Sequence, residues 1–148
     1  VTTTDKGMLA KIKLPSGQTI IHDNIKVSEE PGHTFLLLYD NDPRYAWINP
    51  NRLLIYNEEP AQEVSSEFDK SMKVSADLYR FSSRDHKIGV VDSAEQNIYL
   101  YNPDGSLYKG FPLEGTSRFS IGFLQTSAYR FNLITGGENN YIYNYRVE

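Results

Sequence analysis

The segment Asn97-Ile-Tyr-Leu-Tyr-Asn-Pro-Asp-Gly105 joins a short run of apolar and aromatic residues to a turn sequence. Ile, Leu and Tyr suit a pleated, half-buried strand. Pro-Asp-Gly suits a tight turn, because proline presets φ and glycine tolerates positive φ. Three further segments resemble the strand part: Met8-Leu-Ala-Lys-Ile-Lys-Leu14, Arg52-Leu-Leu-Ile-Tyr-Asn57 and Asn140-Tyr-Ile-Tyr-Asn144. When Leu14, Asn57, Asn102 and Asn144 are taken as equivalent, the segments follow one another in steps of 43, 45 and 42 residues.

A repeat period in the low forties, with strand patterns inside each repeat, is typical of β-propeller blades. The predicted repeat units are approximately 15–57, 58–102 and 103–148, each with four short strands. Met8 to Lys13 is left as one extra N-terminal strand. The predicted strands are 8–13, 19–25, 33–39, 45–48, 52–56, 63–68, 76–81, 87–91, 98–101, 107–111, 118–123, 130–135 and 141–147. The predicted fold class is therefore all-β, with about three four-stranded propeller-type blades in a single domain or fragment spanning 1–148.

Several predicted strands are apolar on both faces, as in Phe35-Leu-Leu-Leu-Tyr39 and Ile98-Tyr-Leu-Tyr101. Continuous apolar runs indicate burial on both sides, whereas a sheet with one wet face shows alternation. Sheets stacked between neighbours meet this condition, so we expect a propeller rather than a two-layer sandwich.

One segment fits two interpretations. Ala61, Val64, Phe68 and Met72 recur at helical spacing, and Pro60 suits the first position of a helix. In steps of two, Val64 and Phe68 share one strand face. We expect a strand because the repeat requires one, and a short helix is the alternative.

The composition excludes several classes of function. The chain has 148 residues, a net charge of −4 at pH 7 and scattered lysines and arginines, so nucleic acid is not an expected partner. It contains no cysteine, which excludes disulfides and thiolate chemistry. No apolar stretch is long enough to span a membrane as a helix. The chain begins with Val1, so we expect a processed protein or a piece of a longer one.

The stretch from Ile98 to Leu113 resembles a propeller repeat of the pyrroloquinoline-quinone or Asp-Gly hairpin type. From Ser82 to Tyr145, the chain resembles the last blades of uncharacterised envelope-associated propeller proteins of Gram-negative bacteria, which end on a strand similar to Tyr141–Tyr145. The resemblance covers the C-terminal half well and the N-terminal half loosely. It implies a propeller fold and a location in the bacterial cell envelope, periplasmic or on the surface. It implies no catalytic residues, because that family has no assigned activity.

Asp40, Asn41 and Asp42 are the candidate metal ligands. They resemble a decayed calcium loop of integrin-type blades, in which Pro43 and Arg44 replace a glycine and further oxygen ligands. Calcium requires six to eight oxygen atoms, and three side chains supply too few. We therefore expect these residues to form a turn through their own backbone hydrogen bonds.

No catalytic constellation is present in the sequence. The three histidines lack metal-ligand spacing, and the carboxylate pairs Glu29-Glu30 and Glu58-Glu59 point to opposite sides of an extended chain. No cofactor is expected. The tyrosines and Trp47 are candidates for recognition because such side chains dominate binding hot spots, although packing between blades is expected for most of them.

These observations predict a non-catalytic scaffold or binding module within a larger envelope protein. The alternative is a propeller enzyme that acts on polysaccharide or uses a quinone cofactor. About three and a half units fall short of the four to eight blades that close a ring. We therefore expect a protein partner, self-association or further blades in a longer chain.

Overall fold

The computed structural model describes residues 2–3, 8–13, 16–26, 32–40, 42–57, 62–69, 71–123 and 131–147. Its regular structure is almost entirely β, with one short 3-10 turn, η1 (Glu138–Asn140). The strands are β1 (Thr2–Thr3), β2 (Met8–Lys13), β3 (Gln18–Lys26), β4 (His33–Tyr39), β5 (Asp42–Ile48), β6 (Arg52–Tyr56), β7 (Gln62–Glu67), β8 (Val74–Arg80), β9 (His86–Asp92), β10 (Asn97–Tyr101), β11 (Leu113–Glu114), β12 (Ser120–Gly122), β13 (Phe131–Gly136) and β14 (Ile142–Val147). The predicted all-β class is confirmed.

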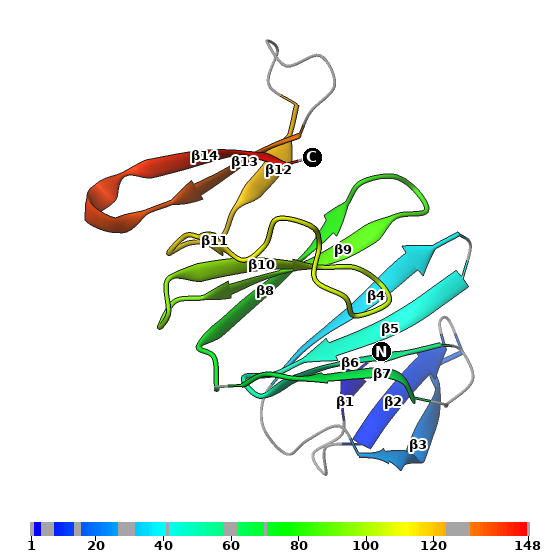
Figure 1. The fold of residues 1–148 in the computed structure, drawn as a ribbon. Coiled ribbons are helices and arrows are strands. Elements are labelled where there is room, and N and C mark those ends of the chain that lie inside the picture. Colours follow the sequence, from blue (N-terminus) through cyan, green and yellow to red (C-terminus); the bar gives the residue numbers. More distant parts are fainter. Residues whose placement is uncertain are drawn as a thin grey trace.

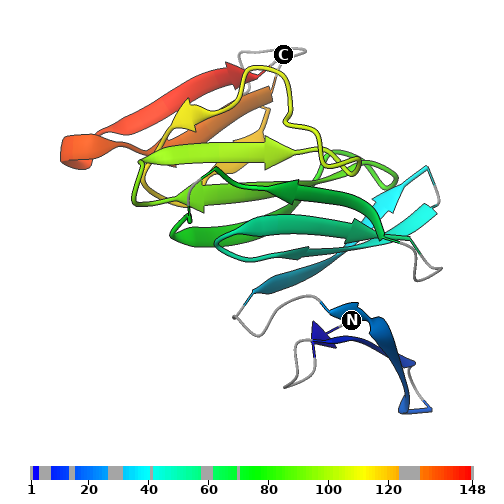
Figure 2. The same cartoon turned by 60° about the horizontal axis from the view of Figure 1, so that its bottom comes forward.

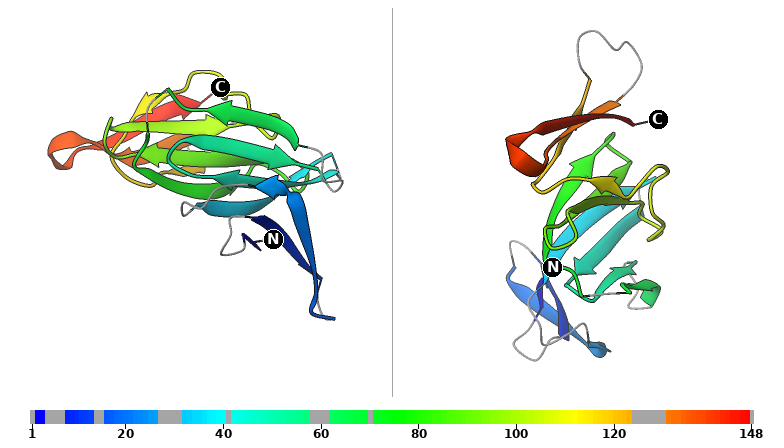
Figure 3. Two further views of the ribbon diagram at one scale, coloured as in Figure 1. Left: turned by 90° about the horizontal axis from the view of Figure 1, so that it is seen from below. Right: turned by 60° about the vertical axis from the view of Figure 1, so that its left-hand side comes forward.

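The strands form four antiparallel sheets in chain order, and within each sheet consecutive strands are neighbours. Sheet I contains β1–β3, sheet II β4–β7, sheet III β8–β11 and sheet IV β12–β14. Sheets II, III and IV lie face to face as successive layers (Figures 1 and 2), whereas sheet I lies beside sheet II at the N-terminal side (Figure 3). The described strands show no closed ring.

The grouping of strands into sheets differs from the predicted repeat units. β7 pairs with β6 and belongs to sheet II, although the predicted boundary lay between residues 57 and 58. β2 pairs with both β1 and β3, so Met8–Lys13 is not a single leftover strand. A sequence period fixes the length of the repeat and leaves its starting point open. Sheets I, II and III each end with the strand that folds back after the recurrent motif, whereas sheet IV ends on β14, which carries the end of the motif itself.

Two local predictions are also corrected. Residues 107–111 form no strand: Leu107 makes an isolated bridge to Tyr101, and the chain then passes Gly110 at φ 91° before β11 begins at Leu113. A positive φ is incompatible with an extended strand. β5 begins at Asp42 rather than at Tyr45, because Tyr39 pairs directly with Asp42 and the turn between them is shorter than predicted. The strand interpretation of residues 63–68 is confirmed by β7.

The core consists of separate layers between the sheets. The buried residues between sheets II and III are Leu37, Ala46, Ile48, Leu53, Ile55, Ala76, Ile88, Val90 and Tyr101. Between sheets III and IV they are Val91, Ile98, Leu100, Phe111, Phe119, Leu133 and Val147. All seven residues of β9 are buried, so sheet III is covered on both faces, as its continuous apolar runs predicted. Each fully buried aliphatic side chain contributes about 1.5 to 3 kcal/mol.

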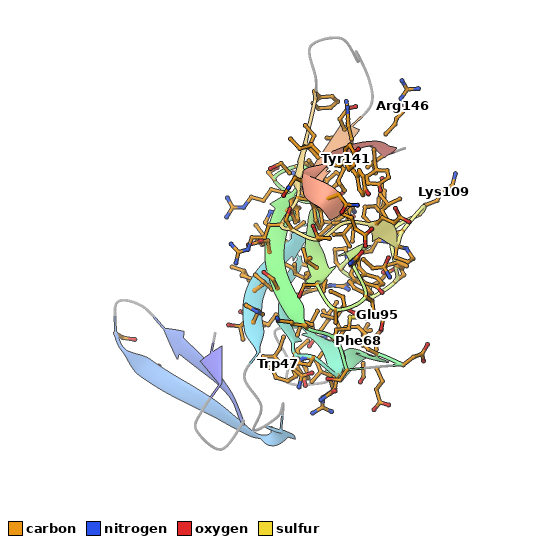
Figure 4. All side chains as sticks on the ribbon, turned by 90° about the vertical axis from the view of Figure 1, so that its left-hand side faces the viewer. Trp47, Phe68, Glu95, Lys109, Tyr141 and Arg146 are labelled. Atoms are coloured by element: carbon orange, nitrogen blue, oxygen red, sulfur yellow. The ribbon has the colours of Figure 1, made fainter. Side chains whose placement is uncertain are left out.

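The second face of sheet II is also apolar. Trp47, Leu54 and Tyr56 are buried together on it. The backbone of Gly32 lies against the indole, since a Cβ at this position would come within 2.6 Å of Trp47 Nε1. Trp47 lies on the side of sheet II that is nearest sheet I (Figure 4).

Two polar contacts join neighbouring sheets. The backbone N–H of Leu38 in β4 donates to Nδ1 of the buried His86 in β9 at 3.1 Å, which links sheets II and III. The Tyr79 hydroxyl in β8 donates to the carbonyl oxygen of Phe119, which leads into sheet IV. The rings of Tyr79 and Phe119 are stacked, with centroids 4.7 Å apart and an interplanar angle of 3°.

Gly89 provides a test of this packing. A Cβ at Gly89 would lie 2.2 Å from the Tyr79 ring and 2.6 Å from the Phe119 ring. We predict that Gly89→Ala lowers the free energy of unfolding by about 1 to 3 kcal/mol, because two stacked rings must move. Chemical denaturation measures this change. Gly122→Ala is the control, since nothing lies within 4 Å of its Cβ position, and an equal loss in both variants would contradict the packing argument.

Candidate functional site

Three turns lie at one end of the stack: β5–β6 in sheet II, β9–β10 in sheet III and β13–β14 in sheet IV. The connections between these sheets lie at the same end. Backbone hydrogen bonds hold each connection against a turn. In sheet II, Phe68 N–H donates to Asn51 O and Met72 N–H to Pro50 O, both at 2.8 Å. In sheets III and IV, Gly115 N–H donates to Gln96 O and Thr116 N–H to Gly136 O, also at 2.8 Å. We call this end of the molecule the turn end.

A buried polar side chain supports the turn end in each of the three sheets. Asn49 Oδ1 accepts from the N–H groups of Asn51 and Arg52 at 2.8 Å. Asp92 Oδ1 accepts from Ala94 N–H at 3.1 Å and from Lys73 N–H at 3.2 Å. The Thr135 hydroxyl donates to Ser117 O at 3.0 Å. These bonds fix the turns and connections that surround the pockets described below.

The first pocket, which we call the tyrosine pocket, lies between sheets II and III at the turn end. It has a volume of about 380 Å³ and is lined by Glu67, Phe68, Asp69, Met72, Asp92, Glu95, Asn97, Tyr99 and Tyr101. Its aromatic rings follow one another. The Phe68 and Tyr101 centroids are 6.2 Å apart, and those of Tyr101 and Tyr99 are also 6.2 Å apart, with the tyrosine rings 12° from parallel. These rings form an aromatic wall.

Four carboxylates line the tyrosine pocket: Glu67, Asp69, Asp92 and Glu95. Among the described residues, no lysine or arginine lines it. Asp92 is only 2 % exposed, and both of its hydrogen bonds end on Oδ1. The pocket therefore combines an aromatic wall with a concentration of negative charge.

The environment keeps the tyrosine hydroxyls of this pocket neutral. Burial raises the pKa of Tyr101 to about 12, with a smaller contribution from neighbouring Tyr99. Burial also raises the pKa of Tyr99, and the Asp92 carboxylate adds to this shift. The two hydroxyls, which are neutral at pH 7 even at the ordinary pKa of about 10, therefore stay neutral to a higher pH than in the unfolded chain.

A second pocket, the glutamate pocket, lies between sheets III and IV. It has a volume of about 190 Å³ and is lined by Glu95, Gln96, Asn97, Glu114, Gly115, Thr116, Glu138 and Tyr143. It shares Glu95 and Asn97 with the tyrosine pocket, so the two are neighbours. Three of its side chains are glutamates, and the negative charge continues across sheet III.

A third pocket, of about 720 Å³, lies on the other side of the sheet II–III connection. Its lining residues are Gly32, His33, Asn49, Pro50, Ser71, Met72, Lys73, Val74 and Ala94. Met72 separates it from the tyrosine pocket, since it lines both. Its only charged lining residue among those described is Lys73, apart from the titratable His33.

Most of the site residues predicted from the sequence lie away from these pockets. Asp40 occupies a turn with φ 47°, Asp42 accepts from Arg44 Nε at 3.2 Å, and Asn41 lies outside the described residues. Within the described ranges, no three histidine or carboxylate side chains are grouped as a metal site would require. The pairs Glu29-Glu30 and Glu58-Glu59 also lie outside the described residues.

The histidines and the aromatic residues named in the sequence analysis lie in different environments. His33 lines the third pocket, whereas His86 links two sheets. Trp47 is buried, so packing is its role. Tyr99 and Tyr101 serve both packing and the pocket wall. The sequence analysis missed the acidic residues Glu67, Asp69, Asp92 and Glu95, although all four stand at strand ends or turns of the repeat, and this position was the available signal.

No protein-family model matches the sequence, and neither a curated protein nor a solved structure matches it significantly. In the part of the chain that the structure describes, no helix has the length and apolar character needed to cross a membrane. Function is therefore inferred from the geometry of the turn end and of the sheet faces.

The raised pKa of Tyr101 gives a pH test of the pocket wall. In the unfolded chain a tyrosine has its ordinary pKa of about 10, whereas the folded value is about 12. Its contribution to stability is complete below pH 10 and is lost as the pH rises toward 12, because the unfolded chain ionises first. We predict that urea midpoints fall over this range, and that Tyr101→Phe reduces the fall.

Other buried tyrosines keep part of the pH dependence in this variant. Burial also raises the pKa of Tyr79 and Tyr56. Tyr141→Phe is the matched control, since this ring is exposed. An identical fall in Tyr101→Phe and in the parent would show that the pocket wall is wetter than the structure indicates.

Proposed function

We propose that this chain is a non-catalytic binding module built of β-propeller-type blades. The observation that supports this proposal best is the repetition of one four-stranded unit in sheets II and III. In both sheets the recurrent motif forms the third strand, and a fourth strand pairs with it antiparallel. Even the register repeats, since Glu67 pairs with Arg52 and Glu114 pairs with Asn97 at equivalent positions of the period.

Stacking of such units on both faces is what radially packed blades require. Sheets II and III each bury both faces. The connections between units cross the turn end, where two acidic pockets lie at successive sheet junctions. In a module of this kind, the sheets form the scaffold and the turn end binds the partner. The bacterial envelope location implied by the sequence resemblance is part of this proposal.

The outer face of sheet IV supports continued stacking. Ile142 stands two residues before Asn144, as Ile55 and Leu100 stand before Asn57 and Asn102. Ile55 and Leu100 are 0 % exposed, whereas Ile142 is 76 % exposed. Exposure alternates along β14, whereas β6 and β10 are largely buried on both faces. In sheets II and III the corresponding face is covered by the next sheet. The outer face of sheet IV has no covering layer among the described residues.

We propose that a β-sheet from a second copy of this chain covers this face in the purified protein. The established contacts between sheets II and III and between sheets III and IV supply the model for it, because the same positions of the repeat are buried there. Ile134, also on this face, is 38 % exposed. Exposed apolar groups gathered on one sheet face mark an interaction surface.

Light scattering at increasing protein concentration tests this association. We predict that the average mass rises with concentration, and that Ile142→Asp weakens the association at least about tenfold, because a charge would be buried at the contact. Leu107→Asp is the control, since Leu107 is an exposed leucine outside sheet IV. A parent chain that stays monomeric at all concentrations would contradict self-association.

A further inference from the structure

We propose that the free edge of β14 binds an extended segment of a partner polypeptide, which adds a fourth strand to sheet IV. The segment carries acidic side chains on one face and apolar side chains on the other. This inference goes beyond the proposed function, because it uses neither the turn end nor the outer face of sheet IV.

The position beside β14 is occupied in the two neighbouring sheets. The recurrent motif forms β6 in sheet II and β10 in sheet III, and a fourth strand, β7 or β11, pairs antiparallel with it. In sheet IV the corresponding strand is β14, which pairs with β13 alone among the described strands. Sheet IV therefore has three described strands where sheets II and III have four.

Two hydrogen bonds in sheet IV show which backbone groups of β14 point to this edge. The Gly136 N–H donates to Ser117 Oγ at 2.9 Å, and the Gly136 carbonyl oxygen accepts from Thr116 N–H at 2.8 Å. Both backbone groups of Gly136 are thus used away from its strand partner, Ile142. Hydrogen-bonded and non-hydrogen-bonded pairs alternate in an antiparallel ladder. Ile142 and every second residue after it therefore direct their N–H and C=O groups to the free edge.

The edge of β14 lacks the features that protect the corresponding edges of the neighbouring sheets. β7 carries Glu63 and Glu67 and has an irregular register near its start. β11 is only two residues long and follows Pro112. By contrast, β14 has six residues, pairs with β13 without a bulge and carries a single charged side chain, Arg146. A long, regular edge of this kind is a template for an added strand.

A pocket beside this edge, which we call the edge pocket, suits the side chains of an added strand. It has a volume of about 230 Å³ and is lined by Lys109, Gly110, Phe111, Leu113, Arg146 and Val147. Leu113 belongs to β11, the fourth strand of sheet III, and Val147 is the last residue of β14. The pocket therefore lies where a fourth strand of sheet IV would pack on the fourth strand of sheet III. Its apolar residues favour an apolar side chain.

Two basic residues give the edge pocket its charge. Lys109 and Arg146 line it, and no carboxylate lines it among the described residues. Both side chains are exposed and project from the same side of the stack (Figure 4). Within the described part of the chain, no carboxylate forms an ion pair with either of them. Two neighbouring cations favour an acidic segment, and a carboxylate beside the guanidinium of Arg146 forms a charge-assisted hydrogen bond.

The pairing geometry gives the sequence pattern of the partner segment. Residues directly opposite each other in an antiparallel pair have their side chains on the same face. The residue opposite Arg146 therefore shares its exposed face and is acidic, and its own N–H and C=O groups point to β14. The residues opposite Tyr145 and Val147 face sheet III, as these two do, and are apolar. The segment thus alternates acidic and apolar residues.

Calorimetric titration of acetyl-Glu-Val-Glu-Leu-Glu-Val-amide into the full chain tests the proposal. One matched peptide carries N-methyl groups on its glutamates, and another carries them on its apolar residues. Only the glutamate N–H groups point to β14, so their methylation should lower the affinity at least about tenfold, whereas methylation of the apolar residues should retain it. A peptide with lysine in place of glutamate should not bind. Equal binding of all four peptides, or no binding of the parent peptide, would overturn the proposal.

Three variants locate the site at β14. Arg146→Gln removes a charge from the edge pocket, and we expect the affinity to fall at least about fivefold. Arg84→Gln is the matched control, because it removes the same charge from an exposed turn outside the pocket. Asn144→Pro removes an N–H group that points to the free edge and none that pairs with β13, so it should also weaken binding. If Arg146→Gln and Arg84→Gln weaken binding equally, the overall charge of the chain attracts the peptide and the site assignment is wrong.

A further variant separates this inference from the proposed self-association. Ile134→Asp changes the outer face of sheet IV on β13 rather than on β14, so it should weaken self-association and leave peptide binding unchanged. If the peptide does not bind and Asn144→Pro abolishes self-association, a second copy occupies the edge and the assignment to a partner polypeptide is wrong. If the peptide binds as expected to a chain that stays monomeric, the edge site stands and only the stacking of copies fails.

Discussion

Burial of sheet III on both faces is the constraint on which the rest of the structure depends. Every residue of β9 is buried, including Lys87, whose ammonium group pairs with Asp85 at 2.9 Å and lies 5.1 Å from the ring centroids of Phe81 and Tyr108. A strand with no wet face forms only when layers on both sides fold with it. Sheets II and IV therefore stabilise sheet III and are stabilised by it, so the three layers are expected to fold cooperatively.

Layered packing also explains why the pockets lie at the turn end. Face-to-face sheets fill the space between them with side chains, whereas their ends diverge at the turns and connections. Buried polar groups such as Asp92 and Thr135 anchor the connections to the turns, which leaves a gap beside each junction. The tyrosine and glutamate pockets are successive gaps of this kind, one on each side of sheet III. Polar residues are favoured at such ends, and here most of the charged ones are acidic.

Much of the fold could be predicted from the sequence, because short strands with apolar runs and Gly or Asp turns have local causes. The strand of Arg52–Tyr56 and the turn at Gly105, with φ 79°, are examples. The grouping into sheets could not be predicted, since pairing of β7 with β6 depends on a hairpin rather than on the period. The pocket was missed for a related reason. Glu67, Asp92 and Tyr101 are separated in sequence, and only the packing of sheet II on sheet III brings them together.

The outer face of sheet IV is less apolar than the sheet faces that are buried between layers. In β14 the outward positions are Ile142, Asn144 and Arg146. Ile142 is equivalent to Ile55 and Leu100, but two residues earlier Asn140 stands where β6 and β10 carry Leu53 and Ile98. A mixed surface of this kind suits a reversible contact, since polar groups keep part of their hydration when the copies separate. The contact lies on a sheet face, whereas the acidic pockets open at the turn end. The proposed association of copies therefore uses a surface other than the turn end, where these pockets lie.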